Sequence, residues 1–240
     1  MSKRANTASV PLEQPSPKRL RHPSDFIGAS IENDSDKFIK AVNALRTEAF
    51  KKHFCPGLPN TWELQGSDVM SKQWLEFCFK LIEKTSREDY ESSSFGWHPR
   101  RKTKEMKEQG MRYIIIEKED DVHQPMYGFL SFLPTHDSTP SVPVLYIYEI
   151  HLHSNARGRG WGKQLVKLAE KFAEDLGVQK IMLTCFVRNE KALGFYRSLD
   201  YQTDACSPAE KKTRNGTLKP DHVIMSKQVQ GLAERGQVEG

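Results

Sequence analysis

A glycine-rich, basic segment over residues 157–163 has the composition of a phosphate-binding turn. It separates a run rich in β-branched and aromatic residues from an amphipathic run. Glycine lets the backbone approach a ligand closely, and the free N–H groups and dipole of a helix N-terminus favour an anion. The segment therefore predicts a turn that binds a pyrophosphate. Its residues are Arg157, Gly158, Arg159, Gly160, Trp161, Gly162 and Lys163. The alternative is a plain strand–helix turn with a surface arginine.

A second chemical group, the carboxylate of Glu149, lies in the preceding apolar run. Strict alternation along a strand places it on one face with Leu145, Ile147 and His151, and leaves Tyr148 on the other face. A buried carboxylate is costly unless it is solvated or paired. Glu149 is thus a candidate general base, acting directly or through water, and the alternative is an ion pair with an Arg or Lys. A β-bulge at this point would turn both Tyr148 and Glu149 toward the same site.

The elements that must position these residues follow from hydrophobic periodicity and turn residues. Helices are predicted over residues 36–50, 67–84, 87–93, 164–176 and 189–199, and residues 98–107 read as a loop or helix end. Strands are predicted over residues 62–64, 112–118, 126–133, 144–153, 180–186, 201–206 and 221–227. Three successive strands favour an antiparallel meander, and residues 144–186 favour a parallel strand–helix–strand unit. The fold class is α/β with a mixed sheet.

Composition limits the domain organisation of the 240 residues, whose net charge is +5. Residues 1–33 are predicted to be a disordered basic tail, 34–228 one folded domain, and 229–240 a flexible tail. Five basic and two acidic residues in the first 30 give that segment +3 of the excess. Charge concentrated in a tail argues against a specific nucleic-acid-binding surface. Residues 17–21 (PKRLR) resemble a nuclear localisation signal, with a solvated basic tail as the alternative.

The remaining composition excludes other classes. No apolar run approaches the roughly 20 residues that span a bilayer, so no membrane association is expected. The four cysteines form no CxxC pair and the eight histidines show no metal spacing, so no metal site is expected. A cytosolic or nuclear protein follows.

Two motifs resemble the GNAT acetyltransferases. Arg157, Gly160 and Gly162 fit the family's (Arg/Gln)-x-x-Gly-x-(Gly/Ala) loop, and residues 189–196 (NEKALGFY) resemble its N-x-x-A-x-x-F/Y-Y stretch. The resemblance implies the GNAT fold, with acetyl-CoA as cosubstrate and its pyrophosphate on residues 157–163. Asn189 would bind the cofactor arm as well as cap its helix. Tyr196 would be either the acid for the departing thiolate or a core aromatic.

Three further segments resemble the N-terminal acetyltransferase D (NatD) type within that family. They are residues 145–152 (LYIYEIHL), 90–97 (YESSSFGW) and 181–186 (IMLTCF), within a resemblance that covers about residues 50–229. It implies transfer of acetyl to the N-terminal serine amine of histone H4 and histone 2A, which begin Ser-Gly-Arg-Gly. The chain departs from the pattern at Phe95, where a Trp is expected, and at His222, where a Tyr is expected. The loop before the fourth strand carries only Asp137, beside His136.

The resemblance also implies roles for single residues. Glu149 and Tyr148 would be catalytic; Ile150, His151 and Leu152 would lie along the cofactor, with main-chain bonds from Ile150 and Leu152 to the pantetheine. The substrate-binding set would be Tyr90, Trp97, Asp137, Tyr148, Thr184, Cys206 and His222. Loop packing is the alternative for Tyr90 and Trp97, and sheet packing for Thr184 and Cys206. An α-amine, whose pKa is roughly 7.7–8.0 against about 10.4 for lysine, needs only a modest base.

We therefore expect a monomeric histone N-terminal acetyltransferase of the nucleus and cytoplasm, with the histone tails and acetyl-CoA as partners. A GNAT enzyme acting on lysine or another amine is the first alternative. A non-catalytic GNAT-like chromatin-binding module is the second.

Overall fold

The computed structural model describes residues 34–55, 57–118, 123, 125–137, 142–178, 180–214 and 216–229. The predicted tail over residues 1–33, and all but the first residue of that over 229–240, lie outside this part of the chain. Among the described residues, no helix has both the length and the apolar character needed to cross a bilayer.

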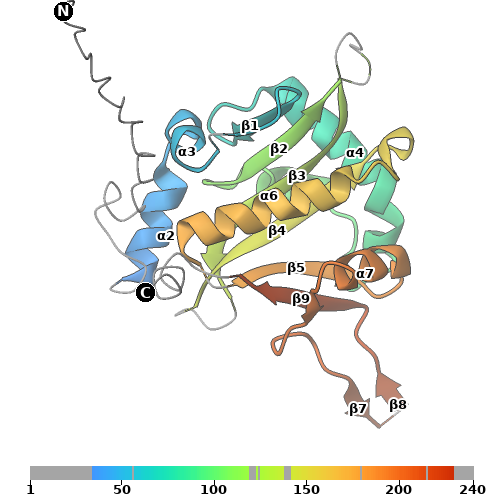
Figure 1. The fold of residues 1–240 in the computed structure, drawn as a ribbon. Coiled ribbons are helices and arrows are strands. Elements are labelled where there is room, and N and C mark those ends of the chain that lie inside the picture. Colours follow the sequence, from blue (N-terminus) through green and yellow to red (C-terminus); the bar gives the residue numbers. More distant parts are fainter. Residues whose placement is uncertain are drawn as a thin grey trace, which may run out of the picture.

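A seven-stranded mixed sheet forms the centre of the domain, in the order β1-β2-β3-β4-β5-β9-β6 (Figure 1). The strands are β1 Trp62–Gly66, β2 Arg112–Glu117, β3 Met126–His136, β4 Pro143–Leu152, β5 Lys180–Phe186, β6 Gln202–Thr203 and β9 His222–Gln228. β2 to β4 form the predicted antiparallel meander, β1 pairs antiparallel with β2, and β4 and β5 are parallel. The predicted mixed α/β architecture is confirmed.

Helices cover both faces of the sheet (Figure 1). On one face lie α2 Ser35–Ala44, α3 Thr47–Phe54 and α6 Trp161–Leu176, and on the other lie α4 Lys72–Glu91 and α5 Pro99–Glu105. The short η1 Ser154–Ala156 and α7 Glu190–Arg197 flank the cavity described below. Each face of the sheet buries its own apolar core against its helices, so the strand residues alternate between two packed layers.

Two helix predictions were wrong in their boundaries. The helix predicted over residues 36–50 is two helices, because Leu45 and Arg46 adopt extended backbone with ψ of 131° and 149°. The helices predicted over residues 67–84 and 87–93 are the single helix α4. Arg87, at the predicted junction, forms ion pairs one turn away in each direction, with Glu83 at 3.6 Å and Glu91 at 2.8 Å.

The segment between the last two predicted strands also differs from expectation. It was predicted as a polar loop, but it contains the hairpin β7 Lys211–Thr213 and β8 Gly216–Leu218, which projects from the sheet (Figure 1). The strand predicted over residues 201–206 is reduced to β6. Residues 98–107, left between loop and helix end, contain α5, which begins with proline at its first position.

Candidate active site

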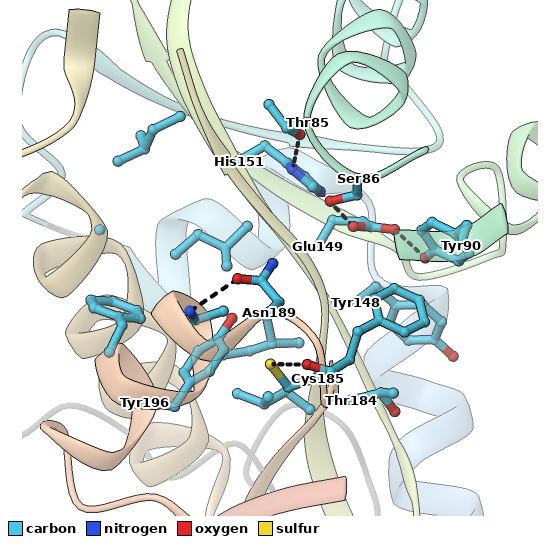
Figure 2. Close-up of a pocket in the computed structure, with 18 of the residues that line it drawn as sticks. Thr85, Ser86, Tyr90, Tyr148, Glu149, His151, Thr184, Cys185, Asn189 and Tyr196 are labelled. Atoms are coloured by element: carbon cyan, nitrogen blue, oxygen red, sulfur yellow. Dashed lines mark hydrogen bonds and ion pairs between the residues drawn. The ribbon is translucent and has the colours of Figure 1, made fainter. Parts of the chain in front are cut away.

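A cavity of about 980 Å³ opens where β4 and β5 separate. Val144–Ile147 of β4 pair with Lys180–Leu183 of β5, and after these residues the two strands diverge. α4 and α5 wall one side of the cavity, and the loop before α6 together with α7 walls the other. In Figure 2, Glu149 and His151 lie on one side of the opening, and Asn189 and Tyr196 lie across from them. Residues that are distant in sequence thus share one cavity.

A β-bulge in β4 aims the candidate base into this cavity. Ser131 of β3 pairs with Glu149 and the next residue, Phe132, pairs with Ile147, so Tyr148 is the extra residue. Leu145 and Ile147 pack in the core beneath α6. After the bulge the alternation is reversed, and the side chain of Glu149 lies toward α4 and α5. A bulge, considered as a possibility from the sequence, is present. The prediction that Glu149 shares a face with Leu145 and Ile147 was wrong, because the bulge shifts the alternation by one residue.

Glu149 is a buried, fully engaged carboxylate with only 7% of its surface exposed. Its Oε1 accepts hydrogen bonds from Lys102 Nζ at 2.8 Å and from the Tyr90 hydroxyl at 3.0 Å. Its Oε2 lies 2.6 Å from His151 Nε2. Burial raises the pKa of Glu149, but the charge of Lys102 and the hydrogen bond with His151 lower it more, to about 2. The carboxylate is therefore ionised and a weak proton acceptor.

Three members of this network were not predicted as site residues. Lys102 on α5 supplies the cation that the ion-pair alternative required, and Glu105 lies 2.5 Å from the same Nζ. Thr85 on α4 contacts His151 Nδ1 at 2.6 Å (Figure 2). A carboxylate in an apolar strand signals that a cationic partner exists, but it does not identify which lysine or arginine the fold will bring to it.

His151 was predicted to lie along the cofactor, and its side chain lies elsewhere. The ring is 7% exposed and sits between Thr85 and Glu149, with Phe129 beside it at a centroid distance of 5.7 Å. It still lines the cavity. The side chain of His151 thus belongs to the carboxylate network, and its contact with the cofactor remains a prediction.

The loop before α6 has the backbone of an anion cradle. Gly158 and Gly160 adopt φ of +76° and +78°, which disfavours any residue with a side chain, and open space surrounds both. The first intrahelical bond is donated by Gln164 to the carbonyl of Gly160, so the preceding N–H groups have no helical acceptor. Arg157, Gly158, Gly160, Gly162 and Lys163 all line the cavity. These features fit a pyrophosphate.

Two residues of the loop lie outside the cavity lining. The guanidinium of Arg159 lies over Trp161 at 5.2 Å and over Tyr127 at 5.9 Å. The rings of Trp161 and Tyr127 are 4.8 Å apart. Arg159 and Trp161 thus brace the outer side of the loop in this structure, and their predicted cofactor contacts remain predictions.

The divergence of β4 and β5 leaves room for an extended chain. Ile150 and Leu152 line the cavity on the β4 side, and Thr184 to Phe186 line it on the β5 side. In this region β4 pairs only with β3, so no strand covers its other edge, as the predicted pairing with pantetheine requires. The carbonyl of Leu152 accepts a hydrogen bond from Arg157 Nε at 3.1 Å. The cavity thus has an anion site at one end and an unpaired strand edge leading from it.

Asn189 caps α7 as predicted. Its Oδ1 accepts a hydrogen bond from the backbone N–H of Ala192 at 3.1 Å, and its Nδ2 donates to Asp89 on α4 at 3.1 Å (Figure 2). The residue also lines the cavity. Asn189 therefore ties α7 to α4 across the site, and its contact with the cofactor remains a prediction.

Four of the predicted substrate residues meet in the cavity. Tyr90, Trp97, Tyr148 and Thr184 all line it. The rings of Tyr90 and Trp97 are 5.5 Å apart, and burial raises the pKa of Tyr148 to about 12, so this phenol keeps its proton. Tyr146 also lines the cavity and reaches Thr184 Oγ1 through its hydroxyl at 2.5 Å. Aromatic rings thus wall the end nearest Glu149.

The other three predicted substrate residues lie outside the lining. Asp137 contacts Lys180 Nζ at 3.3 Å, and the same ammonium contacts Asp204 at 2.7 Å. The N–H of Cys206 donates to Asp204 Oδ1 at 3.0 Å. His222 packs on Phe95, a cavity residue, at a centroid distance of 4.6 Å, and its Nδ1 is 2.7 Å from Asp221. Phe95 and His222, the two departures from the expected pattern, therefore contact each other at the rim.

Tyr196 faces the cavity from α7 and is otherwise buried. Burial raises its pKa, so the phenol keeps its proton. This position fits the predicted acid, although the ring also packs in the core against Tyr201, as the alternative requires. Within the described part of the chain, no group of three or more His, Cys, Asp or Glu side chains could hold a metal ion.

A family model described as "Acetyltransferase (GNAT) family" matches residues 72–201 of the chain, which include the loop, α6 and most of the cavity. The chain belongs to the GNAT acetyltransferase family. It is an acyltransferase, and acetyl-CoA is its cosubstrate, which fits the anion cradle and the unpaired edge of β4.

A curated relative from Saccharomyces cerevisiae, N-alpha-acetyltransferase 40, is 28% identical over 213 residues, covering 77% of this chain and 68% of that protein. A solved acetyltransferase structure from Streptococcus agalactiae superposes with a TM-score of 0.51 at 12% identity, covering 71% of this chain and all of that one. Tetrahymena GCN5 superposes with a TM-score of 0.50 at 11% identity, covering 70% and 96%. These structural matches support the fold alone.

Proposed function

We propose that this GNAT enzyme acetylates the N-terminal α-amine of proteins, specifically the N-terminal serine of histone H4 and histone 2A. The tails of both begin Ser-Gly-Arg-Gly. Support comes from the likeness to N-alpha-acetyltransferase 40 and from the NatD-like segments around Tyr90–Trp97 and Tyr148–Glu149, which line one cavity.

The observation that carries the proposal is the cavity itself, in which Tyr90, Trp97 and Tyr148 line the space beside the buried carboxylate of Glu149. With a pKa of about 2, this carboxylate is too weak a base to deprotonate a lysine ammonium, whose pKa is about 10.4. An α-amine with a pKa of roughly 8 is about one-quarter neutral at pH 7.5, against about 0.1% for lysine. An N-terminal amine can therefore arrive as a nucleophile, and Glu149 need only relay the proton that it loses during transfer.

The residues of the chain divide the remaining work. Acetyl-CoA supplies an activated acetyl thioester when it is bound. The glycine loop and Lys163 would hold its pyrophosphate, and the edge of β4 at Ile150 and Leu152 would align its pantetheine. Tyr90, Trp97 and Tyr148 would orient the peptide N-terminus beside Glu149. Backbone amides would polarise the reacting carbonyl, and no covalent enzyme intermediate is needed.

We further propose that the enzyme acts as a monomer in the nucleus and cytoplasm. The support is the basic PKRLR segment at residues 17–21, which lies outside the described residues. Fluorescence imaging of the full chain and of a form with Lys18, Arg19 and Arg21 changed to Ala would test the location. Loss of the nuclear signal in the altered form is expected, and an unchanged distribution would remove this assignment.

Steady-state kinetics with synthetic peptides test the substrate assignment. The full chain is assayed with acetyl-CoA and a peptide that begins Ser-Gly-Arg-Gly and carries one lysine further along, with the N-terminally blocked form of this peptide, and with a form that begins Ser-Gly-Ala-Gly. We expect turnover of the first peptide, none of the blocked one, and a lower kcat/KM for the third. Acetylation of the blocked peptide would favour the lysine alternative, and peptide binding without any turnover would favour a non-catalytic module.

A further inference from the structure

Lys102 is a buried cation that the proposed mechanism does not use. It is 7% exposed on α5, a helix whose other basic residues, such as Lys104, face solvent. Its Nζ contacts Glu149 at 2.8 Å, the Tyr90 hydroxyl at 2.8 Å and Glu105 at 2.5 Å. An ammonium has three N–H donors, so each has an acceptor. Burying a lysine is unfavourable without such partners, and this one is therefore held in a fixed position.

The contacts of Lys102 determine which part of the Glu149 carboxylate remains open. Each carboxylate oxygen accepts about two hydrogen bonds. Oε1 accepts hydrogen bonds from Lys102 and Tyr90, so both of its acceptor positions are occupied. Oε2 has one contact, with His151 at 2.6 Å, and keeps one acceptor position. A ring nitrogen and a carboxylate oxygen at this distance share a proton, since two facing lone pairs would repel.

We propose that Lys102 is a positioning residue for acetyl transfer, which holds Glu149 ionised and leaves Oε2 as its one oxygen open to the substrate amine. The inference rests on the proposed role of Glu149 in proton transfer. Lys102 does not contact the reacting atoms in this proposal. It binds Oε1 of Glu149, and Oε2 is the oxygen that meets the substrate amine. Thr85 contacts His151 and thereby helps to hold the His151 ring beside Oε2 of Glu149.

The charges around Glu149 show why Lys102 is hard to replace. Titratable groups face the carboxylate from five elements, and they are Tyr90 on α4, Lys102 and Glu105 on α5, Tyr113 on β2, His151 on β4 and Tyr196 on α7. Burial raises the pKa of Glu149, and the charge of Lys102 is the largest opposing influence. Without Lys102, only the contact with His151 still offsets burial, so the carboxyl pKa should rise.

The pH dependence of kcat/KM for Lys102→Met tests this role. In the wild type, Glu149 stays ionised throughout pH 6–9, so the acid limb reports only the substrate amine. In the variant a second ionisation should appear on the acid side, with a loss at least tenfold larger at pH 6 than at pH 9. Lys102→Arg keeps the charge and should keep the wild-type shape. Lys104→Met, an exposed change on the same helix, is the matched control.

A double-mutant cycle separates positioning from a general structural role. If Lys102 acts through Glu149, the pair Lys102→Met with Glu149→Gln should be no slower than Glu149→Gln alone, within about twofold. The pair removes both members of the buried Lys102–Glu149 ion pair and leaves only the partly exposed Glu105 without its cation, so it guards against failure of the single Lys102 variant to fold. The affinity for acetyl-CoA should be unchanged in every folded variant, as measured by calorimetry.

Two results would overturn the inference: a Lys102→Met profile parallel to the wild type, or losses that add in the double variant. Full activity of Glu149→Gln would instead overturn the proposed role of Glu149 itself. The two failures are therefore distinguishable.

Discussion

At the scale of single residues, Glu149 shows how an unfavourable residue type in an apolar strand indicates a functional site. A carboxylate in an apolar strand requires partners, and α4, α5 and β4 each supply one. The sequence indicated this requirement and left open whether the partner would be an active-site group or a structural cation. In the structure Lys102 is both an ion-pair partner and a cavity residue, so the two interpretations describe one arrangement.

Glu149→Gln is expected to lower kcat by about 10²–10⁴, because the amide cannot take a proton at Oε2. Gln keeps the size of the side chain, so the affinity for acetyl-CoA should be unchanged. Steady-state kinetics and calorimetry measure the two quantities. Turnover within twofold of the wild type would show that proton transfer does not depend on this carboxylate.

Tyr196→Phe is expected to lower kcat by about 10–100-fold, because the cavity loses a phenol that is protonated and placed on α7 opposite Glu149. Tyr201→Phe is the matched control, since its ring packs against Tyr196 but lies outside the cavity lining. Rapid kinetics with saturating acetyl-CoA would resolve the step. Equal activity of Tyr196→Phe and Tyr201→Phe would assign Tyr196 to core packing.

At the scale of elements, the loop before α6 is defined by backbone conformation. Gly158→Ala or Gly160→Ala should lower stability by roughly 1–2 kcal/mol, because each alanine would need a left-handed backbone. Open space surrounds both positions, so strain rather than collision is the cause. Displacement of the loop should also weaken acetyl-CoA binding about tenfold. Urea unfolding and calorimetry with coenzyme A provide the two measurements.

Gly194→Ala is the control for these changes. Gly194 lies within α7, with no positive φ and no atom near its missing Cβ. Alanine there should raise stability by roughly 0.5–1 kcal/mol without altering acetyl-CoA affinity. A similar loss of affinity in all three variants would mean that the glycine loop has no special role.

The helix boundaries around α4 and α5 were missed where these helices face the cavity, whereas the break between α2 and α3 lies away from it. The C-terminal part of α4 lacks an apolar stripe because Thr85, Ser86 and Tyr90 line the cavity, so periodicity indicated a break near Ser86. α5 has no apolar pattern because its buried residues include Lys102. Local pattern rules commonly fail at functional sites, and the lapses at α4 and α5 fall on the walls of this one. β4, with a long β-branched and aromatic run, was predictable, but no residue pattern located its bulge.

At the scale of the whole molecule, the outer strands carry a pH-dependent feature. Burial, together with a hydrogen bond that the protonated acid donates to Glu63, raises the pKa of Glu117 to about 7. The folded state therefore favours the protonated acid, and this stabilisation is complete below the ordinary pKa of 4.5 and lost as pH rises through 7. Glu117→Gln should raise the Tm at pH 8 and change it little at pH 4.5.

Thermal unfolding at both pH values checks this expectation, with the exposed Glu210→Gln as control. A Tm that rises equally at pH 4.5 and pH 8 would show that the titration of Glu117 is not involved. The affected strands, β1 and β2, lie at one edge of the sheet, and β3 separates them from β4 and the cavity. Activity at pH 8 should therefore be unaltered in Glu117→Gln.

The sheet order itself was accessible to sequence reasoning only in its central part. The meander and the parallel unit follow from short loops and one crossover helix. The pairing of β9 with β5, and of β6 with the edge of β9, brings strands together over long sequence separations that no local pattern records. The prediction of the whole fold therefore depended on the likeness of two motifs to the GNAT family.

The most direct test of the account is the site of acetylation on one peptide that offers both amines. The peptide begins Ser-Gly-Arg-Gly, continues into a segment with one lysine, and is incubated with the enzyme and acetyl-CoA. Tandem mass spectrometry then locates the acetyl group. The account predicts modification of the serine α-amine alone, abolished by Glu149→Gln. Acetyl on the lysine side chain, with the α-amine free, would contradict it.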